Sequence, residues 1–485
     1  MPFRPVRLRD EVPAPLREGL ERLRQECNVP AAFPAEVLAA AETAAASPRL
    51  PGVDRTDLEF VTIDPPGARD LDQALFIERD GSGFVVWYAI ADVAAFITAG
   101  DPIDTEAHAR GQTFYAPHRR TPLHPPAISE GAASLLPGEV RPALVWRLPL
   151  DDHGLVPVPH VERALIRSRE QLTYAQAQDR IDQGTASESL QLLRSVGLLR
   201  ERIERDRGGV SLNIPEQEVT AADGRWELEF RSTLPVEGWN AQISLMTGMA
   251  AAHLMMYADV GILRTLPPAD NASLRRLRNT AKALHIHWPS EMDYPEFVRS
   301  LDSSRGDHAA MLYACTTLFR GAGYQAFNGV LPADALHAAL AIEYAHATAP
   351  LRRLVDRYVL EICAAICAEV EVPHWVVTEL EGLPEIMADS DRRAKKYERR
   401  IVDLTEALVL SDRVGEVFTG TVVDFDPKRE RGRFMITDPA VEANVKGNSL
   451  PLGQEIEAKL TSVDLHTGVT TFVDTSAQPP RRGKR

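Results

Sequence analysis

The hydrophobic pattern changes its period twice along the chain, and this constrains the fold more than any other feature of the sequence. From Arg55 to about Leu150, apolar residues occur in short runs separated by turns, which is typical of β-strands. Between residues 187 and 413 the pattern is mainly helical, and beyond Gly415 short β-type runs return. With 485 residues the chain is long enough for about three domains. The sequence therefore predicts an α+β fold that ends in a separate all-β unit.

Pro-, Gly- and Ser-rich stretches divide the chain into four predicted segments. Near the start, Leu16, Leu20 and Leu23 recur at helical spacing, and prolines separate them from an Ala-rich run. Two short helices around a turn fit a helix-turn-helix and equally a plain packing appendage. The final β-type runs suit a five-stranded OB-fold barrel, a fold that binds single strands. The predicted segments are a small helical unit at 1–50, a large α+β domain at 51–410, the barrel at 414–475 and a basic, disordered tail at 476–485.

Charge and cysteine content limit the classes of function. The chain has 54 Lys and Arg against 69 Asp and Glu, a formal net charge of −15, which disfavours a protein that coats duplex DNA. An enzyme can still gather its basic residues in one channel. Four cysteines cannot form a disulfide scaffold, and Cys363 and Cys367, four residues apart, favour core packing because no further His or Cys lies near them for a metal.

No segment of the sequence suggests a membrane protein. The N-terminal residues contain no apolar signal core, and the longest uncharged run, Gly238 to Ala258, is interrupted by polar side chains and is expected to form a buried helix. We therefore expect a cytoplasmic protein without a membrane partner, and no obligatory protein partner is evident.

The segment TIDPPGARDLDQAL, residues 62–75, is the most informative stretch for chemistry. It presents Asp64, Asp70 and Asp72 in an irregular loop between two predicted strands. Three carboxylates on one loop suit a hard divalent cation such as Mg²⁺, which prefers oxygen ligands, and would repel one another without one. The spacing alone also arises by chance, so a solvated acidic loop remains an alternative.

A second segment, near residue 350, places two arginines where an anion could bind. Pro350 suits the first turn of a helix after Thr348 as its cap, and an apolar stripe follows from Leu351. Arg352 and Arg353 are then predicted to lie in that first turn, beside free N–H groups and the positive end of the helix dipole. A surface salt bridge is the alternative reading.

Together these motifs resemble the ribonuclease II family, the RNB-domain exoribonucleases. The acidic segment is similar to that family's acidic signature, and several motifs follow in the family's order over about residues 55–410. They are WYAIADVAAFI (87–97), RGQTFYAP (110–117), SLLPGEVRPAL (134–144), LIRSREQLTY (165–174), YAHATAPLRRLVDRY (344–358) and KKYERR (395–400). The terminal barrel matches the OB domain that usually ends such enzymes. The resemblance is to a divergent bacterial-type member, and we expect about fifty N-terminal residues to be too few for the family's paired cold-shock barrels.

The resemblance implies roles for individual residues. Asp64, Asp70 and Asp72 would hold Mg²⁺, with Mn²⁺ as a substitute, and act in catalysis. Arg352 matches the family's phosphate-contacting catalytic arginine. The residues expected to contact RNA are Tyr115, which would stack on the 3′-terminal nucleotides, Tyr174, Arg353, which would fix the helix or the RNA backbone, and Glu398, which lies at the edge of an apolar stripe on a helix predicted over 390–410.

Two positions depart from the family's pattern. The acidic motif normally closes with adjacent aspartates, whereas Gln73 follows Asp72 here. An amide oxygen can coordinate a cation but adds no charge, so Gln73 is expected as a neutral fourth ligand. The segment VEGWNAQISLMTG (236–248) replaces an acidic pair that many relatives have, so no ribose-contacting glutamate is assigned there.

The resemblance implies a metal-dependent hydrolytic exoribonuclease that degrades RNA 3′→5′ to nucleoside 5′-monophosphates. Its expected substrate is RNA that is single-stranded or has a 3′ overhang. The alternative is an RNA-binding relative in which catalysis is weak or was lost with the fourth carboxylate. A deoxyribonuclease is a third reading, which the similarity to enzymes acting on RNA disfavours.

Overall fold

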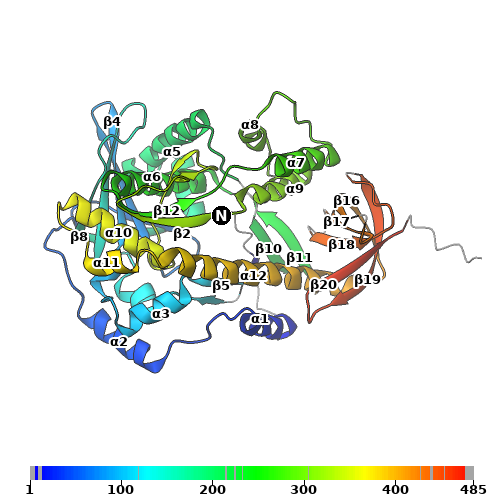
Figure 1. The fold of residues 1–485 in the computed structure, drawn as a ribbon, viewed down its shortest axis with the longest axis horizontal. Helices are drawn as coiled ribbons and strands as arrows, with labels where there is room; N and C mark the ends of the chain where they lie inside the picture. The colour runs from blue at the N-terminus through cyan, green and yellow to red at the C-terminus, as the bar shows by residue number, and fades with distance from the viewer. Residues whose placement is uncertain are drawn as a thin grey trace, which may run out of the picture.

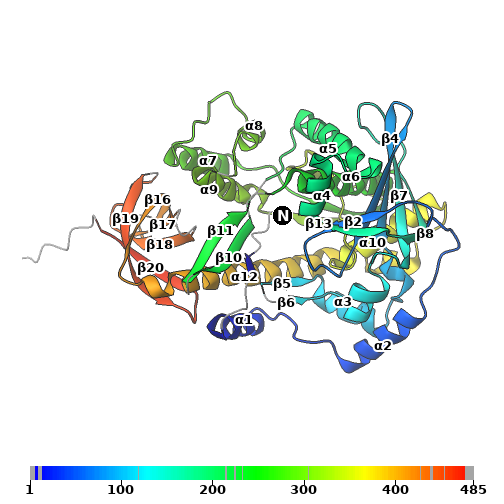
Figure 2. The same cartoon turned by 180° about the vertical axis from the view of Figure 1, so that it is seen from behind.

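The computed structural model describes residues 6–8, 14–117, 119–212, 216–222, 225–231, 233–303, 305–426, 428–436, 441–452 and 454–475. A large body of helices and strands fills one end of the molecule and a small β-barrel the other, with the long helix α12 (Leu383–Leu410) running between them (Figure 1). The opposite view shows the same arrangement, with α1 (Ala14–Glu26) lying alongside α12 (Figure 2). The predicted α+β class with a separate C-terminal barrel is confirmed.

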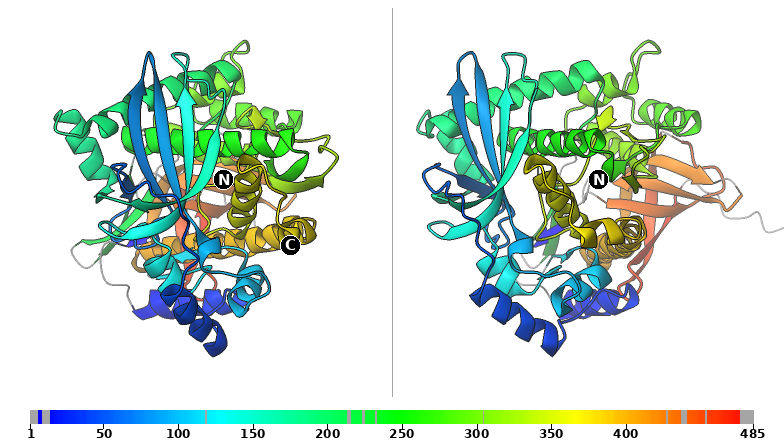
Figure 3. Two further views of the ribbon diagram at one scale, coloured as in Figure 1. Left: turned by 90° about the vertical axis from the view of Figure 1, so that its left-hand side faces the viewer. Right: turned by 60° about the vertical axis from the view of Figure 1, so that its left-hand side comes forward.

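The large body contains a six-stranded sheet, which lies toward the end of the molecule far from the barrel (Figure 3). Its neighbours are antiparallel except for the first and last strands in sequence, β2 and β9, which pair in parallel. In spatial order the strands are β8 (His160–Arg167), β7 (Val140–Leu150), β4 (Gly83–Ala91), β3 (Gln73–Asp80), β2 (Val61–Asp64) and β9 (Glu170–Thr173). The predicted hairpin is present, because Asp80 pairs with Gly83 across a two-residue turn.

Alternating side chains of the sheet face two different cores. One core contains Val86, Tyr88 and Ile90 of β4 and is covered by α4 (Tyr174–Asp182), α5 (Glu188–Arg207), α6 (Pro235–Tyr257) and α10 (Leu354–Cys367). The other contains Ala89 and Ala91 of the same strand and is covered by α2 (Ala35–Ala46), η1 (Val93–Ala95), η2 (Ile128–Ala132) and the start of α3 (Pro102–Arg110). Because successive side chains of a strand point to opposite faces of the sheet, each strand contributes one set of side chains to each core.

Shorter elements complete the large body. The remaining sheets are β1 (Val6–Leu8) with β10 (Glu216–Ala222) and β11 (Arg225–Arg231), β5 (Phe114–Ala116) with β6 (Arg119–Thr121), β12 (Val260–Thr265) with β13 (Gly323–Asn328), and β14 (Leu336–His337) with β15 (Ile342–Glu343). The remaining helices of the body are α7 (Asn271–Ala283), α8 (Tyr294–Arg299), α9 (Gly306–Cys315), η3 (Thr316–Phe319) and α11 (His374–Glu379). The middle of the chain is thus less purely helical than its pattern predicts.

The C-terminal part is a closed five-stranded barrel. Its strands follow the order β16 (Val417–Asp426), β17 (Arg431–Ile436), β18 (Val441–Lys446), β20 (Val469–Asp474) and β19 (Glu455–Asp464), after the short turn η4 (Ser411–Arg413). Phe418, Phe434 and Phe472 fill its interior. Within the described residues, no helix is long and apolar enough to cross a membrane.

The two helices predicted near the start of the chain are present, but they do not share a core. Leu16, Leu20 and Leu23 of α1 pack on α12, whereas α2 packs on the six-stranded sheet. A helix-turn-helix would need the two helices to pack together, so the packing-appendage reading fits this arrangement. The long helix α12 also begins at Leu383, seven residues before the predicted start.

A glycine on α6 allows the segment before Arg352 to pass close to the helix. A Cβ atom at Gly248 would overlap the backbone oxygen of Ala345 and the ring of Tyr344, and Ala345 N–H donates to the Gly248 carbonyl (3.1 Å). We therefore expect Gly248→Ala to lower the free energy of unfolding by about 1–3 kcal/mol, as overpacking does. Gly238→Ala on the same helix is the control: its Cβ would meet only Glu201 Oε1 at 3.4 Å, so the gain in helix propensity should stabilise by up to ~1 kcal/mol. Urea unfolding curves of both variants test this, and equal effects would contradict the close approach.

Candidate active site

Asp64, Asp70 and Asp72 lie on the loop that joins β2 to β3. Asp64 is the last residue of β2, and Asp72, which is 4% exposed, directly precedes β3. Between them the side chain of Leu71 is buried, and its N–H donates to Ser134 Oγ (2.9 Å). This buried anchor holds the loop against the rest of the domain.

Burial raises the pKa of all three carboxyl groups. The pKa values of Asp64 and Asp72 rise to about 7, mainly through desolvation, and the Arg352 guanidinium offsets part of this rise. The pKa of Asp70 is raised for the same reason, and Arg120 opposes the shift. Asp64 Oδ2 is buried and has no hydrogen-bond partner among the described residues. The protein itself therefore compensates the charge of this loop only in part.

Arg352 binds directly to Asp72. Its Nε donates to Asp72 Oδ2 (3.0 Å), and the N–H of Leu351 donates to Asp72 Oδ1 (2.8 Å), so both carboxylate oxygens are used. The Arg352 side chain is 42% exposed and can therefore reach a bound molecule. The structure brings the predicted catalytic arginine and one predicted catalytic aspartate into contact.

The segment that contains Arg352 is a turn and not the start of a helix, so the predicted position of the two arginines in a first helical turn is wrong. Helix α10 begins at Leu354, and Arg353 is its N-cap residue. Arg353 makes two bonds of 2.8 Å to Asp356, a fully buried side chain that also accepts the N–H of Ala349 (2.7 Å). The carboxylate of Asp356 therefore binds both the N–H of Ala349 and the guanidinium of Arg353, which gives Arg353 an ion-pair partner within the protein.

The hairpin β5–β6 brings Tyr115 and Arg120 to the acidic loop. The two residues are cross-strand partners, and Arg120 forms ion pairs with Asp70 and with Glu130. Burial raises the pKa of Tyr115, and the neighbouring Arg352 guanidinium opposes that rise. Tyr115 therefore lies beside the predicted catalytic arginine.

Two further predicted residues, Tyr174 and Gln73, lie at the two ends of the loop, near Asp64 and directly after Asp72. Tyr174 begins α4; burial raises its pKa to about 12 and the nearby Asp64 carboxylate adds to the shift. The amide of Gln73 lies between two partners: Nε2 donates to the Thr348 carbonyl (2.6 Å) and Oε1 accepts from the Tyr88 hydroxyl (2.6 Å). Oε1 of Gln73, the atom predicted to coordinate a cation, is thus engaged within the protein.

Glu398 lies on α12, and its charged neighbours on that helix are Asp391 and Lys395. Burial raises its pKa to about 7. The structure does not place Glu398 among the charged groups that surround the acidic loop. Its predicted contact with RNA remains a prediction.

The raised pKa of Glu398 has a consequence for stability. Because the folded-state pKa of about 7 exceeds the ordinary value of 4.5, the ionised side chain destabilises the fold above pH 7, and the cost disappears as the pH falls to 4.5. We expect Glu398→Gln to stabilise the protein at pH 8 by about 1–2 kcal/mol, less than the full shift implies because the side chain is partly exposed. The advantage should vanish near pH 4.5. Thermal melts of both proteins across this range provide the measurement, and a constant difference would contradict it.

The three aspartates offer the oxygen donors that a hard cation prefers, and the unpartnered Asp64 Oδ2 is a suitable ligand atom. Asp70 and Asp72, by contrast, are paired with Arg120 and Arg352. The part of the chain that the structure describes contains no group of three or more His, Cys, Asp or Glu side chains arranged to hold a metal. The donor chemistry therefore fits Mg²⁺, but the ligands are not preassembled.

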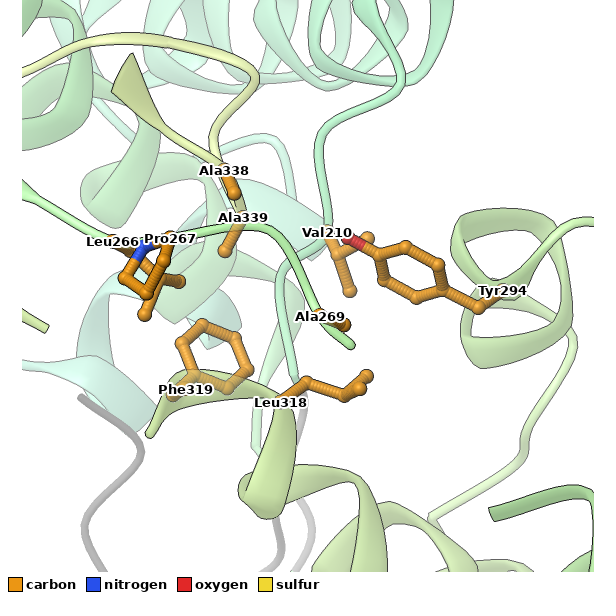
Figure 4. A pocket seen from close by; sticks show the side chains of 9 residues that line it. All are labelled: Val210, Leu266, Pro267, Ala269, Tyr294, Leu318, Phe319, Ala338 and Ala339. Atoms are coloured by element: carbon orange, nitrogen blue, oxygen red, sulfur yellow. The ribbon is translucent and has the colours of Figure 1, made fainter. Parts of the chain in front are cut away.

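A small apolar pocket lies elsewhere in the large body, and its lining comes from other elements (Figure 4). Tyr294 of α8, Phe319 of η3 and Leu266, which follows β12, contribute to it, and none of the lining residues belongs to the acidic loop or to the turn that contains Arg352. The predicted site residues are therefore not gathered around this pocket.

Comparison with known families decides the relationship of the chain. The RNB domain model matches residues 53–369, and the RNase II-type exonuclease C-terminal S1 domain model matches residues 416–474. The chain belongs to the RNB-domain family. The resemblance predicted from the motifs is confirmed, and both the acidic loop and the Arg352 turn of this RNB-family chain lie inside the matched region.

Its relatives include ribonuclease R proteins. The chain is 27% identical to ribonuclease R of Escherichia coli over 398 residues, which cover 76% of this chain and 48% of the relative. It is 24% identical to ribonuclease R of Mycoplasma genitalium over 455 residues, which cover 85% of this chain and 62% of the relative. This RNB-family chain thus spans about half to three fifths of the length of these curated relatives.

Solved structures share the fold of this RNB-family chain. Mycoplasma genitalium RNase R in complex with ribose methylated single-stranded RNA matches with a TM-score of 0.82 at 19% identity, over 95% of this chain and 78% of the other. Yeast Ssd1, described as a pseudonuclease, matches with a TM-score of 0.68 at 16% identity, over 91% of this chain and 57% of the other. The same fold therefore occurs in proteins described as a nuclease and as a pseudonuclease.

Sequence reasoning missed three residues that shape the site. Arg120 had no signal of its own, because only the register of β5–β6 places it opposite Tyr115. Tyr88 lies in a strand motif where its hydroxyl could not be assigned a partner. Asp356 was detectable, since it follows Arg353 at i+3, a spacing that favours an ion pair.

Proposed function

We propose that the chain is a hydrolytic exoribonuclease that removes nucleoside 5′-monophosphates from the 3′ end of RNA in a reaction dependent on Mg²⁺ or Mn²⁺. The contact between Arg352 and Asp72 is the observation that carries the proposal, because it joins a partly exposed cation to a buried carboxylate within the RNB region. The similarity to ribonuclease R proteins supports the reaction class.

Each turnover breaks the bond between phosphorus and the 3′ oxygen of the preceding nucleotide. Water loses one proton as its oxygen bonds to phosphorus, the 3′ oxygen leaves and takes up a proton, and the last nucleotide departs with its 5′-phosphate. Bound by Asp64, Asp70 and Asp72, the divalent cation would supply a Lewis acid for the phosphate oxygens and the attacking water.

The chain's own residues orient the substrate. Arg352 presents positive charge to the scissile phosphate, and Asp72 fixes the direction of its guanidinium through the Nε bond. Tyr115, beside Arg352, stacks on the terminal base so that the scissile bond is held in line, and Tyr174 contacts the nucleotide from the side of Asp64. Arg353, held by Asp356, keeps the turn in place.

A simple assay tests the proposal. RNA labelled at its 5′ end and, in a parallel reaction, RNA labelled at every phosphate are incubated with the protein in either Mg²⁺ or EDTA. The end-labelled products are separated on a gel, and the uniformly labelled products are separated by thin-layer chromatography. We expect a ladder that shortens from the 3′ end, release of 5′-monophosphates, and no reaction in EDTA. Internal cleavage, or nucleoside 3′-monophosphates as products, would overturn the proposal.

The second candidate is an RNA-binding protein without hydrolysis. It is favoured by the neutral Gln73 at the end of the acidic motif, together with a structural neighbour described as a pseudonuclease. In the same assay this candidate would shift RNA on a native gel and leave it intact with Mg²⁺ and with Mn²⁺.

A further inference from the structure

The amide of Gln73 connects three separate parts of the domain. Gln73 is the first residue of β3, its Nε2 donates to the Thr348 carbonyl, and its Oε1 accepts from the hydroxyl of Tyr88 on β4. The oxygen of Tyr88 is also 2.8 Å from Ser244 Oγ on α6. The amide nitrogen faces an acceptor and the amide oxygen faces a donor, so the orientation of the Gln73 side chain is fixed at both ends.

Gln73 and its neighbour Asp72 hold the same turn with complementary bonds. Asp72 accepts the N–H of Leu351, while Gln73 donates to the carbonyl of Thr348, three residues earlier. A carboxylate at position 73 would have no hydrogen to donate to that carbonyl, and the buried Thr348 oxygen would face a negative charge. The turn that carries Arg352 thus needs an acceptor at position 72 and a donor at position 73.

We propose that Gln73 is a positioning residue that holds the Arg352 turn against the acidic loop, and that it is not a cation ligand. This inference rests on the proposed function only for its kinetic part. It explains why an amide ends an otherwise acidic motif. The side chain at this position donates to the Thr348 carbonyl and so keeps the turn that carries Arg352 in place.

The first test measures cation binding without RNA. Gln73→Met keeps the length of the side chain but removes both polar atoms, and a thioether is a poor ligand for a hard cation. Calorimetric titration with Mn²⁺ should give a Kd within twofold of the wild type. A rise of tenfold or more would overturn the proposal, because it would identify Gln73 as a ligand. Tyr88→Phe, which frees Oε1 of Gln73, is the second variant and should likewise leave Mn²⁺ binding unchanged.

The second test is a double-mutant cycle with Arg352. On a short single-stranded RNA, Gln73→Met should lower kcat at least tenfold with little change in KM. In a chain that already carries Arg352→Ala, Gln73→Met should lower kcat little further, because both substitutions remove the action of the same guanidinium. Gln178→Met is the matched control: the amide of Gln178 is also held at both ends, with Nε2 donating to Asp182 of α4 (3.0 Å) and Oε1 accepting the N–H of Val236 on α6 (2.9 Å), so its effect should add fully to that of Arg352→Ala.

Additive losses for Gln73→Met and Arg352→Ala would show a general structural role and overturn the proposal. A wild-type chain that hydrolyses no RNA would instead overturn the proposed function alone. The Mn²⁺ titration of Gln73→Met would then still decide whether Gln73 is a ligand.

Discussion

Asp72→Asn should abolish RNA hydrolysis and leave RNA binding largely intact. The amide oxygen can still accept the N–H of Leu351, so the turn keeps its place. The amide nitrogen, however, would face Arg352 Nε, and two donors cannot bond to each other. The variant loses both a charge at the cation site and the group that orients Arg352, and we expect a loss in kcat of roughly 10³-fold or more.

Single-turnover hydrolysis of a labelled oligonucleotide measures the chemical step, and a gel shift in Ca²⁺ or EDTA measures binding. Glu78→Gln is the matched control, because it makes the same charge change further along β3, where Glu78 accepts a bond from Trp87 Nε1 (2.8 Å) and does not contact the loop. Glu78→Gln should keep wild-type rates. If Asp72→Asn weakened binding as much as hydrolysis, the separation of roles would be wrong.

The parts of the fold that sequence predicted depend on short-range patterns. The hairpin of β3 and β4 follows from two β-type runs around Gly81 and Ser82, and the buried helix α6 from an uncharged run too polar for a membrane. The barrel follows in the same way from regularly spaced short runs. In each case the residues that determine the element lie within the element itself, so one sequence is enough.

The start of α10 shows where this reasoning fails. Thr348 and Pro350 have the residue types of a helix start, but the helix begins only at Leu354. The N–H groups that a helix start would leave free are taken up by side chains: Ala349 donates to Asp356 and Leu351 donates to Asp72. Asp72 is 279 residues away in sequence, and no local pattern reveals such a partner.

In the candidate site, too, residues that share one segment could be predicted together, but contacts between distant segments could not. Asp64, Asp70 and Asp72 share one loop and could be predicted together, whereas the ion pair of Asp70 with Arg120 depends on a hairpin register fifty residues away. The identity of Gln73 was visible as a departure from the family's motif. Its two partners, on β4 and in the Arg352 turn, were not, since their proximity results from tertiary packing.

Arg352 and Arg353 are adjacent in sequence, but replacing each with alanine should have opposite effects on activity and stability. Arg352 is 42% exposed and reaches Asp72 through a single nitrogen, while Arg353 makes two bonds to Asp356, which is 0% exposed. Arg352→Ala leaves Asp72 with the N–H of Leu351, and because the pKa of this buried carboxyl is already about 7, a proton can neutralise it when the arginine is gone, so we expect the free energy of unfolding at pH 7 to fall by only about 1 kcal/mol. Hydrolysis should fall by roughly 10²–10³-fold, because the phosphate loses its charged donor.

Arg353→Ala should behave in the opposite way. It removes the counter-charge of a fully buried carboxylate, and breaking such a pair from one side typically costs about 3–5 kcal/mol. The free energy of unfolding in urea should fall by that amount, while the protein that remains folded at low temperature should hydrolyse RNA at a rate closer to the wild type than Arg352→Ala does. Arg353→Ala, Asp356→Ala is the control, since removing both partners leaves no unpaired charge and should recover part of the lost stability. If the two single arginine variants lost stability equally, or if Arg353→Ala were the less active when folded, the separate roles assigned to these neighbours would be wrong.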